Sequence, residues 1–218
     1  MPAEGTLRDG QAAGFELIET LRWEPESGYL RLPLHLARLQ DSARELGFAY
    51  SEDAAKDALA RAAGGSEPLR VRLVTSRDGA CTVAAQAVKP FAPGTVWRLA
   101  IAETRLDSDD RLLRHKTTLR QRYDAARAEF APAAADEILL LNERGEVCEG
   151  TITNVFIRAG GTWLTPPLSS GLLAGVLRAE MLANGRAREA VLTPDDLRAA
   201  EALAVGNSLR GLIDATLA

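Results

Sequence analysis

The sequence predicts an α+β protein made of two domains, and three observations support this prediction. The chain has 218 residues, of which 46% are hydrophobic, so it is long enough for two domains that each have a core. Its first half contains both strand-like and helix-like segments. Residues 103–114 are rich in charge and lack clear periodicity, which favours a connection between domains. We therefore expect a small α+β domain at residues 1–105, a linker near residues 103–112 and a larger domain at residues 106–218.

In the first half, a hairpin is expected to lead into a helix. A turn through residues 25–28 joins the first two strand candidates, and Gly47 ends the helix that starts at His35. Ser51 is suited to cap the next helix, which the pair Gly64-Gly65 ends. The predicted strands are residues 15–22, 29–34, 69–75, 81–88 and 96–102, and the predicted helices are residues 35–47 and 51–63.

The second half is expected to mix short strands with three helices. Residues 117–130 are rich in alanine and favour a helix, and Gly185 ends another helix that runs from about Leu172 to Asn184. Pro194 is typical of the first residue of a short helix. The predicted strands are residues 137–141, a strand that carries Glu149, and residues 154–157, 162–164 and 202–205.

Composition argues against several classes of function. Acidic and basic residues are mixed along a chain of net charge −4, which leaves no cationic face for a nucleic acid. No apolar run approaches the roughly 18 to 20 residues of a membrane span, and residues 1–5 lack a secretion signal pattern, so we expect a cytoplasmic location. With two histidines and neither HExxH nor clustered Cys/His, we expect no metal site.

Two residues of the second half carry the strongest chemical signal. Lys116 stands in the basic run of residues 114–120, and Glu149 precedes Gly150 at the end of a strand. A lysine can form a Schiff base with a carbonyl cofactor, and a carboxylate can keep a heteroaromatic nitrogen protonated so that the ring withdraws electrons. At about 4 Å and an effective dielectric near 20, such a charge pair is worth about 4 kcal/mol, or about three pKa units. The combination indicates pyridoxal 5'-phosphate as the cofactor.

These segments resemble those of the class IV (fold type IV) pyridoxal phosphate enzymes: branched-chain aminotransferases, D-amino-acid aminotransferases and 4-amino-4-deoxychorismate lyases. Residues 35–39, His-Leu-Ala-Arg-Leu, resemble the family's His-x-x-Arg-Leu, and residues 165–178 resemble its stretch from Thr-Pro to Gly-Ile-Thr-Arg. With residues 15–22 and 206–211, the resemblance covers nearly the whole chain in the family's order. It implies the two-domain fold of these enzymes and a homodimer whose cofactor lies between the domains.

The resemblance also implies roles at the cofactor. Lys116 is implied as the Schiff-base lysine and proton shuttle, and Glu149 as the partner of the ring nitrogen. Tyr123 is a candidate for the tyrosine that reaches the cofactor's phenolic oxygen in branched-chain aminotransferases. The implied phosphate-binding residues are Arg38, Val176, Leu177, Asn207 and Ser208. Leu177 stands where the family often has threonine, so only its main-chain amide is left for such a contact.

Substrate carboxylates require further cations. Arg77 resembles a carboxylate-binding position in some members of the family. The substrate-binding candidates are Arg77, Arg210 and Thr20, and the alternatives to Arg77 are Arg72, Arg105 and Arg210.

A 4-amino-4-deoxychorismate lyase, acting on a small molecule in folate biosynthesis, is the leading hypothesis. Fourteen residues precede Phe15, fewer than class IV enzymes commonly carry. Residues 15–23 and 207–211 look most like lyase domains that are sometimes fused to aminodeoxychorismate synthase. The alternatives are a class IV aminotransferase acting on branched-chain or D-amino acids, and a cofactor-binding protein with little activity.

Overall fold

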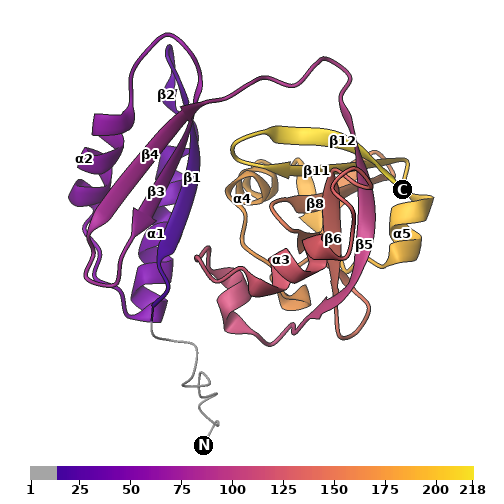
Figure 1. Ribbon diagram of the computed structural model, residues 1–218. Helices are drawn as coiled ribbons and strands as arrows, with labels where there is room; N and C mark the ends of the chain where they lie inside the picture. Colours follow the sequence, from indigo (N-terminus) through magenta and orange to yellow (C-terminus); the bar gives the residue numbers. More distant parts are fainter. Residues whose placement is uncertain (1–13) are drawn as a thin grey trace, which may run out of the picture.

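The computed structural model describes residues 14–218 and contains two separate β-sheets with helices packed beside them (Figure 1). The predicted α+β class is confirmed. The predicted first domain starts at residue 1, and its residues 1–13 lie outside the described residues. Within residues 14–218, no helix combines the length and the apolar composition needed to cross a membrane.

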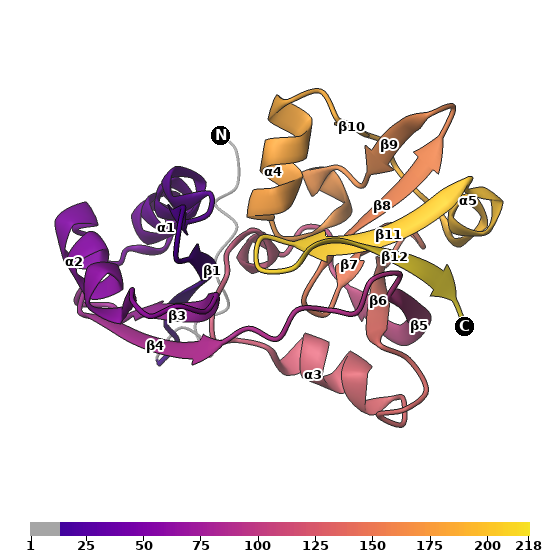
Figure 2. The ribbon, with the colours of Figure 1, turned by 90° about the horizontal axis from the view of Figure 1, so that it is seen from above.

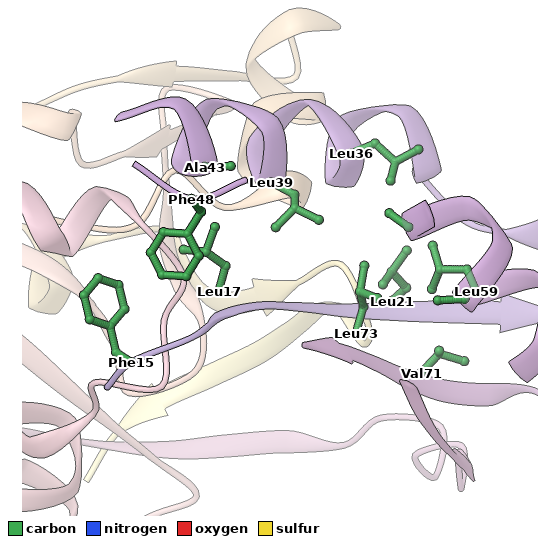
Figure 3. Packing of buried hydrophobic residues seen from close by; sticks show 12 residues of the cluster. Phe15, Leu17, Leu21, Leu36, Leu39, Ala43, Phe48, Leu59, Val71 and Leu73 are labelled. Carbon is green, nitrogen blue, oxygen red and sulfur yellow. The ribbon is translucent and has the colours of Figure 1, made fainter. Parts of the chain in front are cut away.

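The first domain is a four-stranded antiparallel sheet with two helices on one face (Figure 2). Its strands are β1 (Leu17–Glu24), β2 (Gly28–Tyr29), β3 (Leu69–Thr75) and β4 (Cys81–Ala87), in the order β2-β1-β3-β4. The helices are α1 (Leu32–Leu46) and α2 (Glu52–Ala62). Because side chains alternate along a strand, Leu17 and Leu21 of β1 meet Leu36 and Leu39 of α1 (Figure 3), and Thr20 faces the other way.

One predicted element of this domain is wrong, because residues 29–34 do not continue as a strand beyond Tyr29. The helix α1 begins at Leu32 and has Pro33 in its first turn, where the missing amide hydrogen would have had no partner. Arg31 immediately before it takes a left-handed conformation with φ 57°. This sharp change of chain direction ends the strand pairing and starts the helix early.

The connection between the domains lies earlier than predicted. The strand β5 (Val96–Leu106) is interior to the second sheet, where it pairs in parallel with β12 (Gly211–Leu217) and β6 (Glu137–Asn142). The chain therefore crosses between domains at residues 88–95, which corrects both the boundary at 105 and the linker near 103–112 (Figure 1). Of the charges that suggested a linker, Glu103 and Arg105 are exposed side chains that alternate with less exposed ones along β5, and the others follow the end of this strand.

The second domain is built on an eight-stranded mixed sheet, ordered β10-β9-β8-β11-β12-β5-β6-β7. Besides β5, β6 and β12, its strands are β7 (Val147–Gly150), β8 (Asn154–Ala159), β9 (Thr162–Thr165), β10 (Ala187–Glu189) and β11 (Ala202–Asn207). Its helices are α3 (Gln121–Ala128), α4 (Val176–Ala183) and α5 (Pro194–Ala199), with 3₁₀ turns at Arg111–Arg114 and Leu168–Ser170. Thus β10 and β12 were not predicted, and the first two of these helices begin four residues later than expected.

Candidate active site

A cavity of about 370 Å³ opens between the two domains, and residues of both domains line it. The predicted cofactor residues on its wall are Lys116, Glu149, Arg38, Val176, Asn207, Ser208 and Tyr123. Among the substrate candidates, Thr20, Arg72 and Arg210 line it. Leu177, Arg77 and Arg105 are not part of this wall. The structure therefore brings together most of the residues that the sequence singled out.

Lys116 reaches the cavity from a segment that is attached to the first sheet. Its carbonyl accepts a hydrogen bond of 2.9 Å from the amide of Ile18, and the amide of Thr118 donates to the carbonyl of Glu16 at 3.0 Å. Burial by the cavity walls, followed by the charge of Arg38, lowers the pKa of Lys116 to about 8. Much of this amine is therefore neutral near that pH, which is the form that attacks a carbonyl carbon.

Glu149 lies at the end of β7, opposite Leu140 of β6, and is only 4% exposed. Its Oε1 accepts hydrogen bonds from the Tyr123 hydroxyl at 2.7 Å and from the Leu173 amide at 3.2 Å. Its Oε2 receives no hydrogen bond from residues 14–218. Burial is the largest effect and raises the pKa of Glu149 to about 7, although both donors and the Lys116 charge act to lower it. This acid therefore ionises readily once a cationic N–H faces its free oxygen.

Tyr123 lines the cavity and contacts the buried acid. Its hydroxyl proton is donated to the carboxyl of Glu149, and burial followed by that carboxylate's charge raises the pKa of the tyrosine well above its usual value. The guanidinium carbon of Arg120 lies 5.0 Å from the centre of its ring. In the structure Tyr123 therefore positions the acid, and its contact with the cofactor's phenolic oxygen stays a prediction.

The loop that follows β7 is held by a second buried acid, Glu137 on β6. Its carboxylate accepts hydrogen bonds from the hydroxyls of Thr151 and Thr153 at 2.6 and 2.9 Å, the amide of Ile152 at 3.1 Å and the guanidinium of Arg127 at 2.8 Å. Glu137 has no exposed surface, so these donors replace the water that the carboxylate has lost. The shape of the cavity wall at residues 150–154 therefore depends on this side chain.

Replacing Glu137 with glutamine is expected to lower the free energy of unfolding by about 3 kcal/mol, because the new amide turns its own N–H bonds toward buried donors. Equilibrium urea denaturation measures this loss. Glu26→Gln is the matched control, since Glu26 is exposed in the β1–β2 turn and should change stability by less than about 0.5 kcal/mol. Equal stabilities for the two variants would contradict the assigned role.

Another part of the cavity wall offers donors for a phosphate group. The Nε and Nη2 of Arg38 donate to Glu19 at 2.8 and 2.6 Å, and its Nη1 donates to the Ala174 carbonyl at 3.1 Å. A guanidinium has five N–H bonds, so one on each Nη atom is left for an anion. The helix α4 begins at Val176, and the first amides of a helix attract anions.

Asn207 and Ser208 lie where β11 turns into β12. The Asn207 carboxamide shapes this turn: its oxygen accepts from the amides of Leu209 and Arg210, and its nitrogen donates to the Ile152 carbonyl at 3.1 Å. The Ser208 hydroxyl instead lies 2.8 Å from Nε2 of His35 in the first domain. Asn207 therefore stabilises the turn, and Ser208 supplies a hydroxyl group to the cavity wall.

Sequence reasoning missed Glu19, which binds both Arg38 and His35. A signal was present, because Glu19 is an acid between Leu17 and Leu21, at a strand position that points toward the helices. A charge at an inward position of a strand indicates a buried partner of opposite charge.

Three arginines form a cationic part of the cavity wall: Arg70 and Arg72 on β3, and Arg210 after β11. None of them has an ion-pair partner within residues 14–218. Burial, followed by the charge of Arg70, lowers the pKa of both Arg72 and Arg210. An anion bound here would relieve the repulsion between these like charges.

Arg77 lies away from the cavity. Its guanidinium donates to the carbonyls of Leu46 and Gly47, each at 3.3 Å, and lies over the ring of Phe48, 4.6 Å from its centre. The prediction that Arg77 binds a substrate carboxylate is therefore wrong, because the end of α1 and this ring hold it elsewhere. Arg105 is likewise occupied, by the Glu103 carbonyl at 2.9 Å.

The two-domain fold, with an amine, a buried acid and anion donors around one cavity, defines an enzyme site for pyridoxal phosphate. The chain belongs to the class IV amino-transferase family, whose model matches residues 16–217. Enzymes of this family depend on pyridoxal phosphate, and the predicted family, fold and cofactor are confirmed.

Some relatives of this chain are named as aminodeoxychorismate lyases and others as aminotransferases. A Schizosaccharomyces pombe protein named "Putative aminodeoxychorismate lyase" is 30% identical over 200 residues, which are 89% of this chain and 86% of the relative. A Mesorhizobium loti structure described as a "Putative amino-acid aminotransferase" is 54% identical with a TM-score of 0.92, over 94% of this chain and 100% of that one. The 4-amino-4-deoxychorismate lyase of Pseudomonas aeruginosa is 27% identical with a TM-score of 0.79, over 100% of this chain and 88% of that one.

Proposed function

We propose that this protein is a 4-amino-4-deoxychorismate lyase, which converts aminodeoxychorismate to 4-aminobenzoate and pyruvate. The observation that carries the proposal is the group of arginines without acidic partners at 70, 72 and 210 on the cavity wall. Aminodeoxychorismate has two carboxylates, so it matches more cationic donors than an apolar amino acid with one carboxylate does. The name of the Schizosaccharomyces pombe relative supports the same function.

The residues around the cavity fit pyridoxal phosphate. The amine of Lys116 and the free Oε2 of Glu149 suit the aldehyde carbon and the ring nitrogen, and Arg38, Ser208 and the Val176 amide suit the phosphate. When bound, this cofactor withdraws electrons from the substrate carbon that bears the amine. The Glu149 carboxylate holds the proton on the ring nitrogen that makes this withdrawal strong.

Lys116 is the proton carrier of the proposed reaction. Its neutral amine removes the proton from the amine-bearing carbon, and the resulting ammonium gives a proton to the methylene carbon of the departing enolpyruvyl group. The bond between the substrate's ring carbon and the ether oxygen breaks, pyruvate leaves, and the ring becomes aromatic. The atoms balance without water or a second substrate, while Arg72 and Arg210 hold the carboxylates.

A class IV aminotransferase is the second candidate function. The specific observation in its favour is the name of the Mesorhizobium loti protein, which shares 54% identity with this chain. In that reaction Lys116 would again move the proton of the amine-bearing carbon, and the amino group of the substrate would pass to a keto acid. The residues at the cofactor would serve either reaction, so the substrate side of the cavity decides between them.

Incubation of the purified holoenzyme with aminodeoxychorismate tests the proposal. We expect pyruvate and 4-aminobenzoate in equal amounts, measured by coupled lactate dehydrogenase and by fluorescence. A parallel incubation contains a branched-chain or D-amino acid with 2-oxoglutarate. A keto acid in that sample without pyruvate in the first would favour the aminotransferase, and no product in either would favour a cofactor-binding protein. Both outcomes contradict the proposed lyase.

Arg72→Gln is expected to raise the KM for aminodeoxychorismate by about 10- to 100-fold, because one charge-assisted contact with a carboxylate is lost. Steady-state kinetics of pyruvate release measures this change. Arg188→Gln is the matched control, since Arg188 is exposed on β10 and should leave the KM unchanged. An unchanged KM in Arg72→Gln would remove this arginine from the substrate site.

We also propose that the enzyme acts in the cytoplasm, in folate biosynthesis, as a homodimer in which a loop of the partner completes the cavity. The resemblance to the family supports this assembly. Sedimentation velocity is expected to show a species of twice the chain mass at micromolar concentration. A monomer that retains full turnover would contradict the dimer.

A further inference from the structure

A buried acid, an imidazole and a hydroxyl form a continuous chain across the domain interface. Glu19 on β1 and His35 on α1 belong to the first domain, whereas Ser208 belongs to the second. The Nδ1 of His35 lies 2.6 Å from Oε2 of Glu19, and its Nε2 lies 2.8 Å from Oγ of Ser208. All three side chains are buried, and the proposed proton transfer at Lys116 uses neither Glu19 nor His35.

The protonation of one imidazole nitrogen follows from the state of Glu19. Burial alone would raise the pKa of this carboxyl, but the charge of Arg38 and the hydrogen bonds from His35 and Arg38 outweigh it and lower the pKa to about 2. An ionised carboxylate can only accept hydrogen bonds. The Nδ1 atom of His35 therefore carries a proton, which it donates to Glu19.

The second nitrogen then has two possible states, and they have opposite effects on Ser208. If Nε2 carries no proton, it accepts the hydroxyl proton of Ser208, and only oxygen lone pairs face the cavity. Those lone pairs repel an anion. If Nε2 is protonated, it donates to the Ser208 oxygen, and the hydroxyl proton is free for an anion.

We propose that His35 is a positioning residue that takes up a proton from solvent when the cofactor's phosphate arrives, and thereby turns the Ser208 hydroxyl into a phosphate donor. Glu19 and His35 act through Ser208 and do not touch the phosphate themselves. Phosphate binding and proton uptake at this imidazole are then linked, so each favours the other.

The charges around His35 make this linkage physically reasonable. Among residues 14–218, Glu19 from β1 is the one acid hydrogen-bonded to the ring, and Arg38 lies one turn further along α1. Arg22 and Arg31 donate to the carbonyls of Leu209 and Ser208 at 3.3 and 3.4 Å, and each is also paired with an acid, Arg22 with Glu24 and Arg31 with Glu180. Lys116 lies across the cavity. The three arginines are thus each paired with an acid, and the two negative charges of an entering phosphate would compensate for one more positive charge on the imidazole.

The first test compares the binding of pyridoxal phosphate with that of pyridoxal, which lacks the phosphate. His35→Phe and Ser208→Ala are expected to weaken binding of the phosphate form by about 10- to 100-fold and to change binding of pyridoxal by less than about twofold. His35→Gln is expected to retain most of the affinity, because its amide N–H can donate to Ser208 in place of Nε2. Equal losses for both ligands would show a purely structural role and overturn the inference.

The second test observes the ring in the unmodified protein. The chain has two histidines, His35 and His115, so a nitrogen-15 spectrum of labelled histidine contains two rings, and His115→Gln assigns them. At one fixed pH, addition of pyridoxal phosphate is expected to protonate Nε2 of His35, and addition of pyridoxal is expected to leave the ring unchanged. An Nε2 that stays unprotonated, or that responds equally to both ligands, would overturn the inference.

This inference rests on cofactor binding and not on the lyase reaction, and binding alone is the readout. A protein that shows the expected His35 response and releases no pyruvate would contradict the proposed function and support the inference. A protein that releases pyruvate but whose His35 ring does not respond to the phosphate would support the proposed function and contradict the inference.

Discussion

Lys116→Ala is expected to abolish covalent attachment of pyridoxal phosphate and to reduce turnover by at least about 10³-fold. The variant loses both the amine that bonds to the cofactor and the group that carries the proton. The purified variant is expected to lack the visible absorbance of the wild type. Borohydride reduction, which adds the mass of the pyridoxyl phosphate group to the wild-type chain, is expected to leave the mass of the variant unchanged.

The chain provides its own controls for this experiment, because its three lysines are Lys56, Lys89 and Lys116. Lys56 is exposed on α2 and pairs with Glu52 at 2.6 Å, and Lys89 is exposed in the connection between the domains. Peptide mapping after reduction should find the label at position 116, and alanine at either other position should leave labelling intact. Label on Lys56 or Lys89 of the wild type, or any label retained after Lys116→Ala, would contradict the assignment.

Glu149→Gln is expected to reduce turnover by about 10²- to 10³-fold while the cofactor still attaches to Lys116. A charge pair at about 4 Å and an effective dielectric near 20 is worth about 4 kcal/mol, which is close to three factors of ten in rate if the full amount is lost. The glutamine oxygen can still accept from Tyr123, so the geometry is retained and mainly the charge is removed. Single-turnover kinetics and borohydride labelling separate the two effects. Normal turnover in this variant would show that the ring nitrogen needs no anionic partner here.

The same substitution is expected to stabilise the protein when no cofactor is bound. The pKa of Glu149 is raised from 4.5 to about 7, so the folded chain binds this proton more tightly than the unfolded chain does. Its contribution to stability is therefore full below about pH 4.5 and is lost as the pH rises to about 7. We expect Glu149→Gln to unfold at higher urea concentration than wild type at pH 8, with a free energy of unfolding larger by at most about 3 kcal/mol. Near pH 4.5 the two proteins should not differ. A less stable variant at pH 8 would contradict this account.

Local sequence patterns predicted elements well where a strand separates two different environments. β3 was predicted at residues 69–75 and forms over Leu69–Thr75, because its inward residues Val71 and Leu73 alternate with arginines. β12 was missed although it also alternates, with Ile213 and Ala215 buried. Its place in the sheet depends on β5 and β11, and the pairing with β5 joins residues that are 118 positions apart, so no local pattern predicts it.

For the site, sequence predicted the two residues whose chemistry is unusual and was less successful with their surroundings. Lys116 and Glu149 were predicted from their chemistry and from the resemblance of the segments around them to the class IV family, and both line the cavity. The role of an arginine or a tyrosine depends instead on which partner is nearest in space. Arg77 donates to two carbonyls and lies over an aromatic ring, and Tyr123 donates to Glu149. None of these partners is adjacent in sequence to the residue that it contacts.

The amine and the acid are carried by different halves of the molecule. The main chain at Lys116 is bonded to β1 through Ile18, whereas Glu149 belongs to a strand of the second sheet. The distance between the Lys116 amine and the Glu149 carboxylate, which the cofactor must span, is consequently set by how the two domains pack against each other. Substitution of a residue at that interface, such as Arg31 with its hydrogen bond of 2.8 Å to Glu180, should therefore change turnover although no reacting side chain is itself replaced.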